Sequence, residues 1–426
     1  MNKFIIIWIG QIFSTIGSRT SMLALVIWAW NSTESATALA LGSFFLTFPG
    51  IASSLVAGVA VDRFNRKWLI IIGDAISGLA SVTFMLIYFS GHLQIWHLYA
   101  IFALLSPFVR LQILASETAI ALLVPERHYS RAAALRAMLG YGSQIIAPAL
   151  AGALYPLIGL GGILTFDLTT FVLAIAMLVS VRFPPAKPQP TSPAKPPSWT
   201  RELTFGWRYL RSRPSLATLA AIDASFWFVH DLASAVDSPM ILARSRGNAT
   251  VFGSVSSAAG VGGTIGAIVA SLRVGPRRPI RGWWLAIIAA GSAKIVFGLG
   301  RSLWVWLPAQ FVASLNFPFM ASCQQSIWLS KVASDCQGRV LATIDLFRQV
   351  VGAIAMLIAG PLADWVFEPA LQSGGWLAPM LGGLFGTGTG AGISLLYVLA
   401  AIAMVWVGAI ARMSKSLQAV ETLQRQ

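Results

Sequence analysis

The sequence predicts an all-α membrane protein in which twelve transmembrane helices form two six-helix bundles. Its 426 residues are 56% hydrophobic and 11% charged, and the mean hydropathy is +0.73. About a quarter of the residues in a typical soluble protein are charged. The apolar stretches are long and do not alternate with polar residues, which favours helices over a barrel. This composition excludes a soluble enzyme, a disordered regulator and a disulfide scaffold.

A membrane-crossing helix needs about 20 mostly apolar residues. Twelve stretches meet this requirement: 4–30, 38–61, 68–90, 96–124, 137–158, 161–181, 215–241, 250–272, 282–300, 303–329, 340–366 and 391–411. The fifth and sixth stretches are closely spaced, and a Gly-rich segment leads into the last one. The first stretch is too long for a signal-peptide core and no A-x-A-like cleavage site follows it. We therefore predict that it is a true transmembrane helix.

The distribution of lysine and arginine predicts the orientation. With the N-terminus inside, 23 of the 30 Lys and Arg residues fall in inner segments, three in outer segments and four within spans. Inner loops of membrane proteins carry such an excess. We therefore expect a multi-pass protein of the cell (inner or plasma) membrane with both termini in the cytoplasm. Because the basic residues are spread over every inner loop, the net charge of +15 indicates topology, and we expect no nucleic-acid partner.

The longest inner segment, 182–214, predicts the boundary between the two bundles. It begins with FPPAKPQPTSPAKPPSW, and such Pro-rich sequences are extended spacers that pack no core. The expected domains are thus an N-terminal bundle at 1–181, this linker, and a C-terminal bundle at 215–426. The following WTRELTFGWRYLRSRP alternates aromatic and basic residues, which predicts an amphipathic helix on the inner leaflet. A helix that docks a partner is the alternative.

The inner loop between the second and third spans reads GVAVDRFNRK (58–67). It resembles the signature G-x-x-x-D-R-x-G-R-R/K of the major facilitator superfamily. The matching residues are Gly58, Asp62, Arg63, Arg66 and Lys67. Asn65 replaces a glycine, and asparagine tolerates a left-handed backbone. The resemblance implies the major facilitator fold and a cluster that latches the inner gate when the transporter opens outward. A positive-inside loop with an incidental acid is the alternative.

Shorter stretches are similar to the branch of this superfamily that exports drugs and siderophores, including macrolide-efflux proteins and the enterobactin exporter. They are Gln11 with Ser14 and Gly17-Ser18-Arg19, Ser35-Ala36-Thr37-Ala38, Leu123-Val124-Pro125-Glu126, and Gly338-Arg339-Val340. In the fifth span, Gly142, Pro148 and Gly152 resemble an antiporter motif that bends a helix, although Ala147 stands where the family has glycine. Pro148 removes a backbone hydrogen bond and kinks the helix. An ordinary interface of small residues is the alternative.

Ionisable residues inside the spans are the candidate functional residues, because each costs at least about 2.5–3.5 kcal/mol at the membrane centre. They are Arg19, Asp74, Arg110, Glu117, Asp167, Asp223, His230, Asp231, Asp237, Lys294, Asp345 and Arg348. An acid that alternates between dry and wet surroundings can couple proton movement to helix motion. The proton-coupling candidates are Asp231 with His230, Glu117, and Asp223. A static buried ion pair is the alternative for each.

Six of the remaining charges and two aromatic residues are candidates for contact with the transported molecule. They are Arg19, Arg110, Asp167, Phe226, Trp227, Lys294, Asp345 and Arg348. Asp345 and Arg348 are spaced i,i+3 and can neutralise each other, and Arg110 lies two turns from Glu117 on one helix face. Lipid-facing packing is the alternative for the two aromatics. We expect Cys323 and Cys336 to be packing residues.

Together these patterns predict a secondary transporter that exports an amphipathic small molecule (drug, macrolide or siderophore-like) by proton antiport with alternating access. No pattern of a membrane enzyme is present: the four His and two Cys give no metal-ligand spacing, and GTGTG at 386–390 lacks the lysine of a phosphate-binding loop. We expect no cofactor beyond the proton gradient and no metal. The expected partners are the small molecule, protons and lipid, and we expect a monomer. The alternatives are a proton-coupled importer of a nutrient or peptide, and a non-transporting membrane sensor or scaffold.

Overall fold

The computed structural model describes residues 2–181, 199–272, 278–334 and 336–422, and these residues form helices without strands. The Pro-rich segment 182–198 of the expected linker lies outside the described residues. The elements are α1 (Asn2–Thr33), α2 (Ala36–Arg63), α3 (Arg66–Phe89), α4 (Ile95–Leu123), η1 (Glu126–His128), α5 (Tyr129–Ser180), α6 (Trp199–Arg211), α7 (Pro214–Arg244), α8 (Ala249–Leu272), α9 (Pro279–Leu299), α10 (Leu303–Lys331), α11 (Gln337–Pro361), η2 (Leu362–Phe367), α12 (Glu368–Leu371), α13 (Ala378–Phe385), α14 (Ala391–Met413) and α15 (Lys415–Thr422).

Ten helices of the described residues are long and apolar enough to cross a membrane. Two differences separate this number from the twelve expected spans. The fifth and sixth spans are joined in one stretch, Arg131–Ser180, and the more polar α10 is absent from the ten although it has 29 residues. Counting the two arms of α5 separately and adding α10 gives the twelve helices that the sequence predicts.

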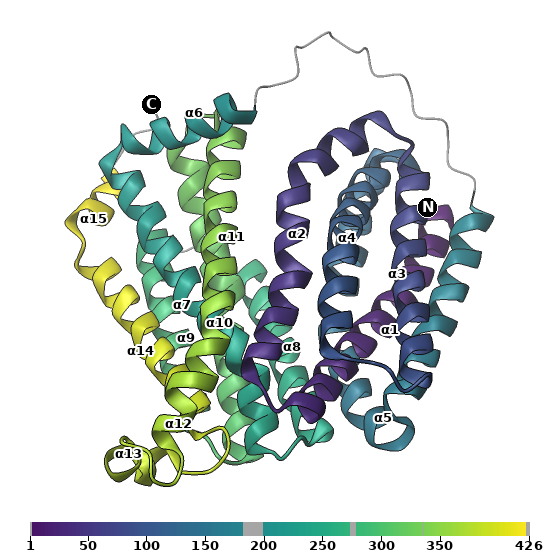
Figure 1. The fold of residues 1–426 in the computed structure, drawn as a ribbon. Coiled ribbons are helices and arrows are strands. Elements are labelled where there is room, and N and C mark those ends of the chain that lie inside the picture. The colour runs from purple at the N-terminus through teal and green to yellow at the C-terminus, as the bar shows by residue number, and fades with distance from the viewer. Residues whose placement is uncertain (1, 182–198, 273–277, 335, 423–426) are drawn as a thin grey trace. The chain divides into compact units, whose positions relative to one another are not determined.

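The break within α5 lies at Gly159, between the expected fifth and sixth spans. A straight helix of 52 residues would be about 78 Å long, far more than a membrane needs. Gly159 has φ 62° and ψ −171°, a backbone conformation open only to glycine. The chain therefore reverses here, as the turn labelled α5 shows in Figure 1. The sequence prediction of two spans is confirmed.

The chain forms two compact units. The first comprises Met1–Pro188 and Ile241–Ser257, and the second comprises Gln189–Met240 and Ala258–Gln426. These units are defined by contacts, whereas the two expected bundles follow chain order, so the linker boundary at 182–214 stays a prediction.

In the first unit, α5 packs against both α1 and the first part of α8. Near Pro148, two hydroxyl groups of α8 donate hydrogen bonds to backbone carbonyl oxygens of α5. Ser257 Oγ donates to Ile145 O at 3.0 Å, and Thr250 Oγ1 donates to Gly152 O at 3.0 Å. A Cβ on Gly152 would come within 3.0 Å of Ala249 O, so the helices can approach only because this residue is glycine. The small residues around Pro148 thus form a close helix contact, while a role in antiport stays a prediction.

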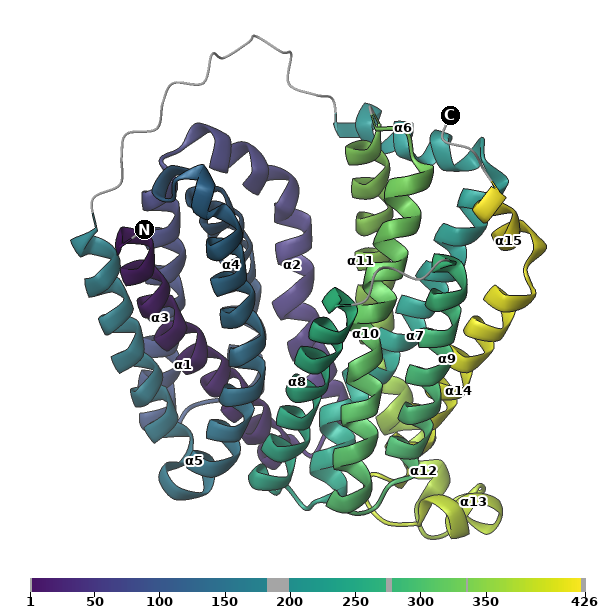
Figure 2. The same ribbon diagram turned by 180° about the vertical axis from the view of Figure 1, so that it is seen from behind.

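The second unit has a core rich in large aromatic side chains. Phe226 of α7, Trp283 of α9 and Trp328 of α10 are buried together, and α9 lies between α10 and α14 (Figure 2). Cys323 and Cys336 are both buried, free and part of this cluster, which confirms that they are packing residues.

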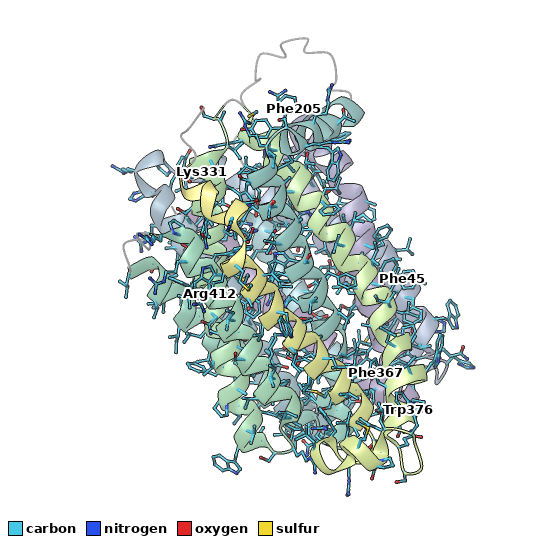
Figure 3. The ribbon with its side chains drawn as sticks, turned by 90° about the vertical axis from the view of Figure 1, so that its left-hand side faces the viewer. Phe45, Phe205, Lys331, Phe367, Trp376 and Arg412 are labelled. Atoms are coloured by element: carbon cyan, nitrogen blue, oxygen red, sulfur yellow. The ribbon has the colours of Figure 1, made fainter. Side chains whose placement is uncertain are left out.

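Helix α6 forms where the sequence predicts an amphipathic helix. Its Trp207 ring lies 6.1 Å from that of Phe347 on α11, and the Arg339 guanidinium lies 4.1 Å from the Phe205 ring. Phe205 and Trp376 lie at opposite ends of the second unit (Figure 3). The helix therefore packs on the second unit at the end opposite α13.

The Gly-rich segment before α14 is held by two charged residues. The Glu368 carboxylate accepts hydrogen bonds from Gly390 N at 2.6 Å and Ile393 N at 3.1 Å, at the N-terminus of α14. Arg301 Nη2 donates to Gly383 O and Leu384 O at the end of α13. The Glu368 carboxylate therefore accepts the backbone hydrogen bonds that a bound phosphate would need.

Candidate functional site

The main group of buried charges lies in the second unit, around α7. Asp223, His230 and Asp237 are spaced seven residues apart and so fall within about 40° on one face of the helix. Asp231 lies beside them. Electrostatic partners come from other helices: Lys294 of α9 interacts with Asp231 and Asp237, and Arg348 of α11 interacts with Asp223 and Asp231. The structure thus brings together several candidates that sequence analysis treated singly.

Lys294 occupies the interior of this unit and is only 5% exposed. Its ammonium lies 5.3 Å from the centre of the Tyr397 ring and 6.0 Å from that of Phe317. A lysine in an apolar interior requires compensation by negative charge. Asp231 and Asp237 provide it, so their ionisation and that of Lys294 depend on one another.

Asp231 lies where α7 meets α11. A Cβ on Gly352 would overlap Asp231 Oδ2, so glycine at this position makes room for the carboxylate. Arg348, one turn earlier on α11, donates to Asp345 Oδ1 at 2.6 Å and lies 4.7 Å from the Trp227 ring. The expected pair of Asp345 and Arg348 is present and partly exposed. Arg348 therefore links a surface carboxylate to the buried group.

His230 is enclosed by aromatic rings. The Phe226 ring stacks on it at 5.8 Å, and the Phe317 ring of α10 lies at 4.7 Å. Ser234 Oγ lies 3.3 Å from His230 Nε2, while Nδ1 has no hydrogen-bond partner among the described residues. Phe226 has no exposed surface, so it forms part of the core and would have to move to meet a transported molecule.

Buried acids of the first unit have a different environment. Asp167 of α5 accepts hydrogen bonds from Ser18 Oγ at 3.0 Å and from Ser81 Oγ at 2.7 Å. Asp74 of α3 accepts from Gln11 at 3.1 Å and from Gln112. Both acids are at most 3% exposed. Neutral donors from three helices thus satisfy these carboxylates.

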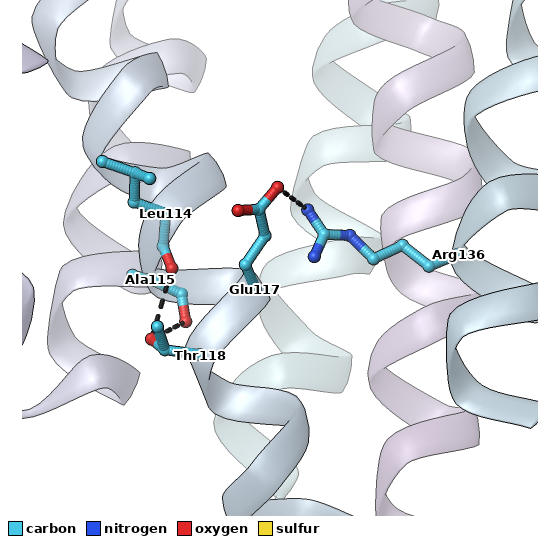
Figure 4. Close-up of polar contacts among 5 residues, drawn as sticks. All are labelled: Leu114, Ala115, Glu117, Thr118 and Arg136. Atoms are coloured by element: carbon cyan, nitrogen blue, oxygen red, sulfur yellow. Dashed lines mark hydrogen bonds and ion pairs between the residues drawn. The ribbon is translucent and has the colours of Figure 1, made fainter. Parts of the chain in front are cut away.

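Glu117 lies in a third environment, half-exposed and beside Arg136 of α5 (Figure 4). It accepts a hydrogen bond from Arg136 Nη2 at 2.8 Å, and the two side chains are 49% and 32% exposed. Arg110, which shares a helix face with Glu117, is not its partner. Arg19 and Arg110 form no hydrogen bond or ion pair with any residue in the part of the chain that the structure describes.

The expected gating motif is described only in part. The side chains of Gly58, Asp62 and Arg63 lie outside the described residues. Lys67 Nζ donates to Val181 O at 2.8 Å, at the C-terminal end of α5. Asn65 has φ −66°, outside the left-handed region, and its side chain caps α3 by accepting a hydrogen bond from Lys67 N at 3.0 Å.

The sequence named Asp237 among the ionisable candidates but gave it no role, and it did not single out Gly352. Asp237 lies seven residues after His230, and this spacing on one helix face was a usable signal. Gly352 gave none, because glycines are common in these spans and its importance depends on α7 placing Asp231 against α11.

Apolar helices that enclose a cluster of acids and bases are features of a secondary transporter of the membrane. This chain belongs to the Major Facilitator Superfamily, whose family model matches residues 7–356. It is therefore a multi-pass transporter of a small molecule, and this superfamily is one of transporters, not of enzymes.

Relatives and solved structures agree with this assignment. The chain is 25% identical over 365 residues to macrolide efflux protein A of Streptococcus pyogenes, covering 85% of this chain and 89% of that protein. It is 25% identical over 330 residues to the multidrug efflux pump Tap of Mycobacterium bovis (strain BCG / Pasteur 1173P2), covering 74% and 76%. A bacterial homologue of the human lysosomal transporter Spinster has a similar fold, with a TM-score of 0.68 and 16% identity over 99% of this chain and 97% of that one.

Proposed function

We propose that this transporter exports an amphipathic small molecule, of the drug, macrolide or siderophore type, in exchange for protons. In this proposal both termini lie in the cytoplasm, as the distribution of Lys and Arg predicts. Two relatives that cover most of the chain are named as efflux proteins, for macrolides and for multiple drugs, which supports the direction and the class of cargo.

The observation that carries the proposal is the charge balance around α7. Asp223, Asp231 and Asp237 are the buried acids of this group. Lys294 is its buried base, and Arg348 interacts with the group while also pairing with the partly exposed Asp345. Full ionisation would leave at least one uncompensated negative charge in an apolar interior, which is unfavourable. Binding of a proton or of a cationic group on the cargo removes this excess, so the site favours exchange of the two.

Asp231 is our choice for the acid that exchanges the proton. It interacts with both bases, Lys294 and Arg348, and it lies at the contact between α7 and α11. A shift of α7 relative to α9 and α11 changes its distance from both bases. Such a carboxylate binds a proton when its bases withdraw and releases it when they return.

Proteoliposomes that contain the purified chain test this proposal, with a radiolabelled macrolide as the probe and an imposed pH gradient. We expect gradient-driven accumulation that an uncoupler abolishes. Asp231→Asn should lose this accumulation but retain exchange of macrolide down its own gradient. Glu34→Gln, which neutralises an exposed acid between α1 and α2, is the matched control.

Accumulation that survives the uncoupler, or that survives combined neutralisation of Asp231, Asp223 and Glu117, would refute proton antiport. In whole cells, an exporter lowers the amount of macrolide in energised cells relative to uncoupled ones. A higher amount would instead support the importer.

A further inference from the structure

An apolar groove of about 640 Å³ lies in the second unit, away from the buried charges. Three helices form it: the side of α7 from Ala217 to Val229, the start of α11 from Thr343 to Val351, and the last turns of α6. Asp223 and Asp231 do not line it. This volume is within the range of about 300–1,000 Å³ that small-molecule sites occupy.

The walls of the groove consist almost entirely of apolar side chains. The α7 wall consists largely of alanine, including Ala217, Ala220, Ala221 and Ala224, so the hollow exists because these side chains are short. Arg211 at the end of α6 is the one charged residue among those that line the groove. The groove thus offers an apolar channel with a cation at one end.

The mouth of the groove is continuous with exposed apolar surface. Trp207 is 54% exposed and Phe347 is 43% exposed, and their rings lie 6.1 Å apart. Ile354, two turns further along α11 from Phe347, is 48% exposed. The groove therefore opens onto exposed apolar surface of the second unit.

The length of the groove matches one leaflet. From Ala217 to Val229 a helix rises about 18 Å, and half of the hydrocarbon core of a bilayer is about 15 Å thick. Arg211 lies near the start of this path, whereas Arg208, one turn earlier on α6, does not line the groove. A chain that begins at Arg211 and ends near Val229 therefore spans a leaflet from its polar edge to the midplane.

We propose that this groove binds one anionic phospholipid of the leaflet next to α6, with an acyl chain along α7 and the phosphate at Arg211. An apolar channel of leaflet length with a single cation at its polar end fits this class of ligand, since each basic residue near an anionic membrane surface contributes about 1 kcal/mol. The inference is independent of the direction of transport.

The test measures lipid that remains on the purified full-length chain. The protein is reconstituted in bilayers of phosphatidylcholine and phosphatidylglycerol, released into detergent and examined by native mass spectrometry. We expect one retained phosphatidylglycerol per chain. Arg211→Gln should reduce its retention by about fivefold, the effect of losing about 1 kcal/mol. Arg208→Gln removes the same charge from the same helix outside the groove and should leave retention unchanged.

A second variant tests the apolar channel itself. Ala221→Phe fills the α7 wall and should also lose the lipid, whereas Ser271→Phe, at an exposed position of α8, should keep it. The melting temperature of each variant shows whether it is folded, and Arg211→Lys should retain the lipid. Equal retention of phosphatidylcholine, equal loss from Arg208→Gln, or full retention by a folded Ala221→Phe variant would overturn the proposal.

Discussion

Buried acids are stabilised differently in the two units of this transporter. In the first unit, serine and glutamine donate hydrogen bonds to Asp167 and Asp74. In the second unit, Asp237 depends on the charge of Lys294 and Asp231 on the charges of Arg348 and Lys294, and Asp237 Oδ1 has no hydrogen-bond partner among the described residues. Buried polar groups are normally satisfied, so such exceptions require an explanation.

The difference indicates which unit can respond to a proton. Neutral donors satisfy a carboxylate without changing their own charge, so they hold it in one arrangement. A carboxylate beside a buried lysine compensates the charge of that lysine only while it is ionised. Its ionisation is therefore linked to the positions of α9 and α11, which carry the bases. We therefore expect variants of the second unit to change coupling and variants of the first unit to change stability.

The largest effect is expected at Lys294. Lys294→Met leaves Asp237 in an apolar interior without its cation and leaves Asp231 with Arg348 alone, and a buried charge that loses its partner costs about 3–5 kcal/mol. We expect a large fall in the melting temperature of the purified protein and loss of gradient-driven transport. Adding Asp237→Asn should recover part of the melting temperature, because it removes the uncompensated charge. If Lys294→Met alone had neither effect, the electrostatic interpretation of the second unit would be wrong.

Much of this fold follows from the sequence, because hydrophobicity and helix-breaking residues are local signals. The expected span 38–61 corresponds to Ala36–Arg63, and 391–411 corresponds to Ala391–Met413. The reversal at Gly159 fell between two expected spans. The pair of Asp345 and Arg348 was also predictable, since both residues lie on one turn of one helix.

Contacts between helices were not predictable in the same way. Glu117 pairs with Arg136 of α5 instead of Arg110 of its own helix, because the rotation of α5 decides which side chains meet. The association of Asp237 with Lys294 depends likewise on how α9 is rotated. A single sequence shows which residues share a face of a helix, but it does not show which helix packs against that face. The group of charges around α7 could therefore be identified only from the structure.

A smaller effect, on stability alone, is expected at Asp167. Asp167→Asn replaces hydrogen bonds to a charged group by weaker ones, and such bonds are worth about 1.5–3 kcal/mol. We expect a lower melting temperature with intact proton dependence of transport. Asp74→Asn should behave in the same way, because its donors are also neutral. Loss of proton dependence at an unchanged melting temperature would place coupling in the first unit and reverse the comparison.

Gly352 allows a finer test of the second unit. In Gly352→Ala the new methyl group overlaps Asp231 Oδ2 and displaces the carboxylate from its place between α7 and α11. We expect gradient-driven transport to fall by about three- to tenfold, equivalent to about 0.7–1.4 kcal/mol. Gly338→Ala is the matched control, because it lies on the same helix and its Cβ would meet nothing within 4 Å. Equal activity of the two variants would show that the position of Asp231 is unimportant.

The smallest effect is expected for the surface pair of Glu117 and Arg136. Exposed ion pairs contribute about 0.2–1 kcal/mol, since water and salt screen both charges, and these side chains are 49% and 32% exposed. Unfolding measurements on Glu117→Gln, Arg136→Gln and the double variant should give a coupling energy within that range that decreases as salt is added. Transport by all three should keep its proton dependence. A Glu117→Gln variant that folds normally but no longer responds to the pH gradient would move the exchanging acid to α4, and the charge balance around α7 would then serve stability instead of coupling.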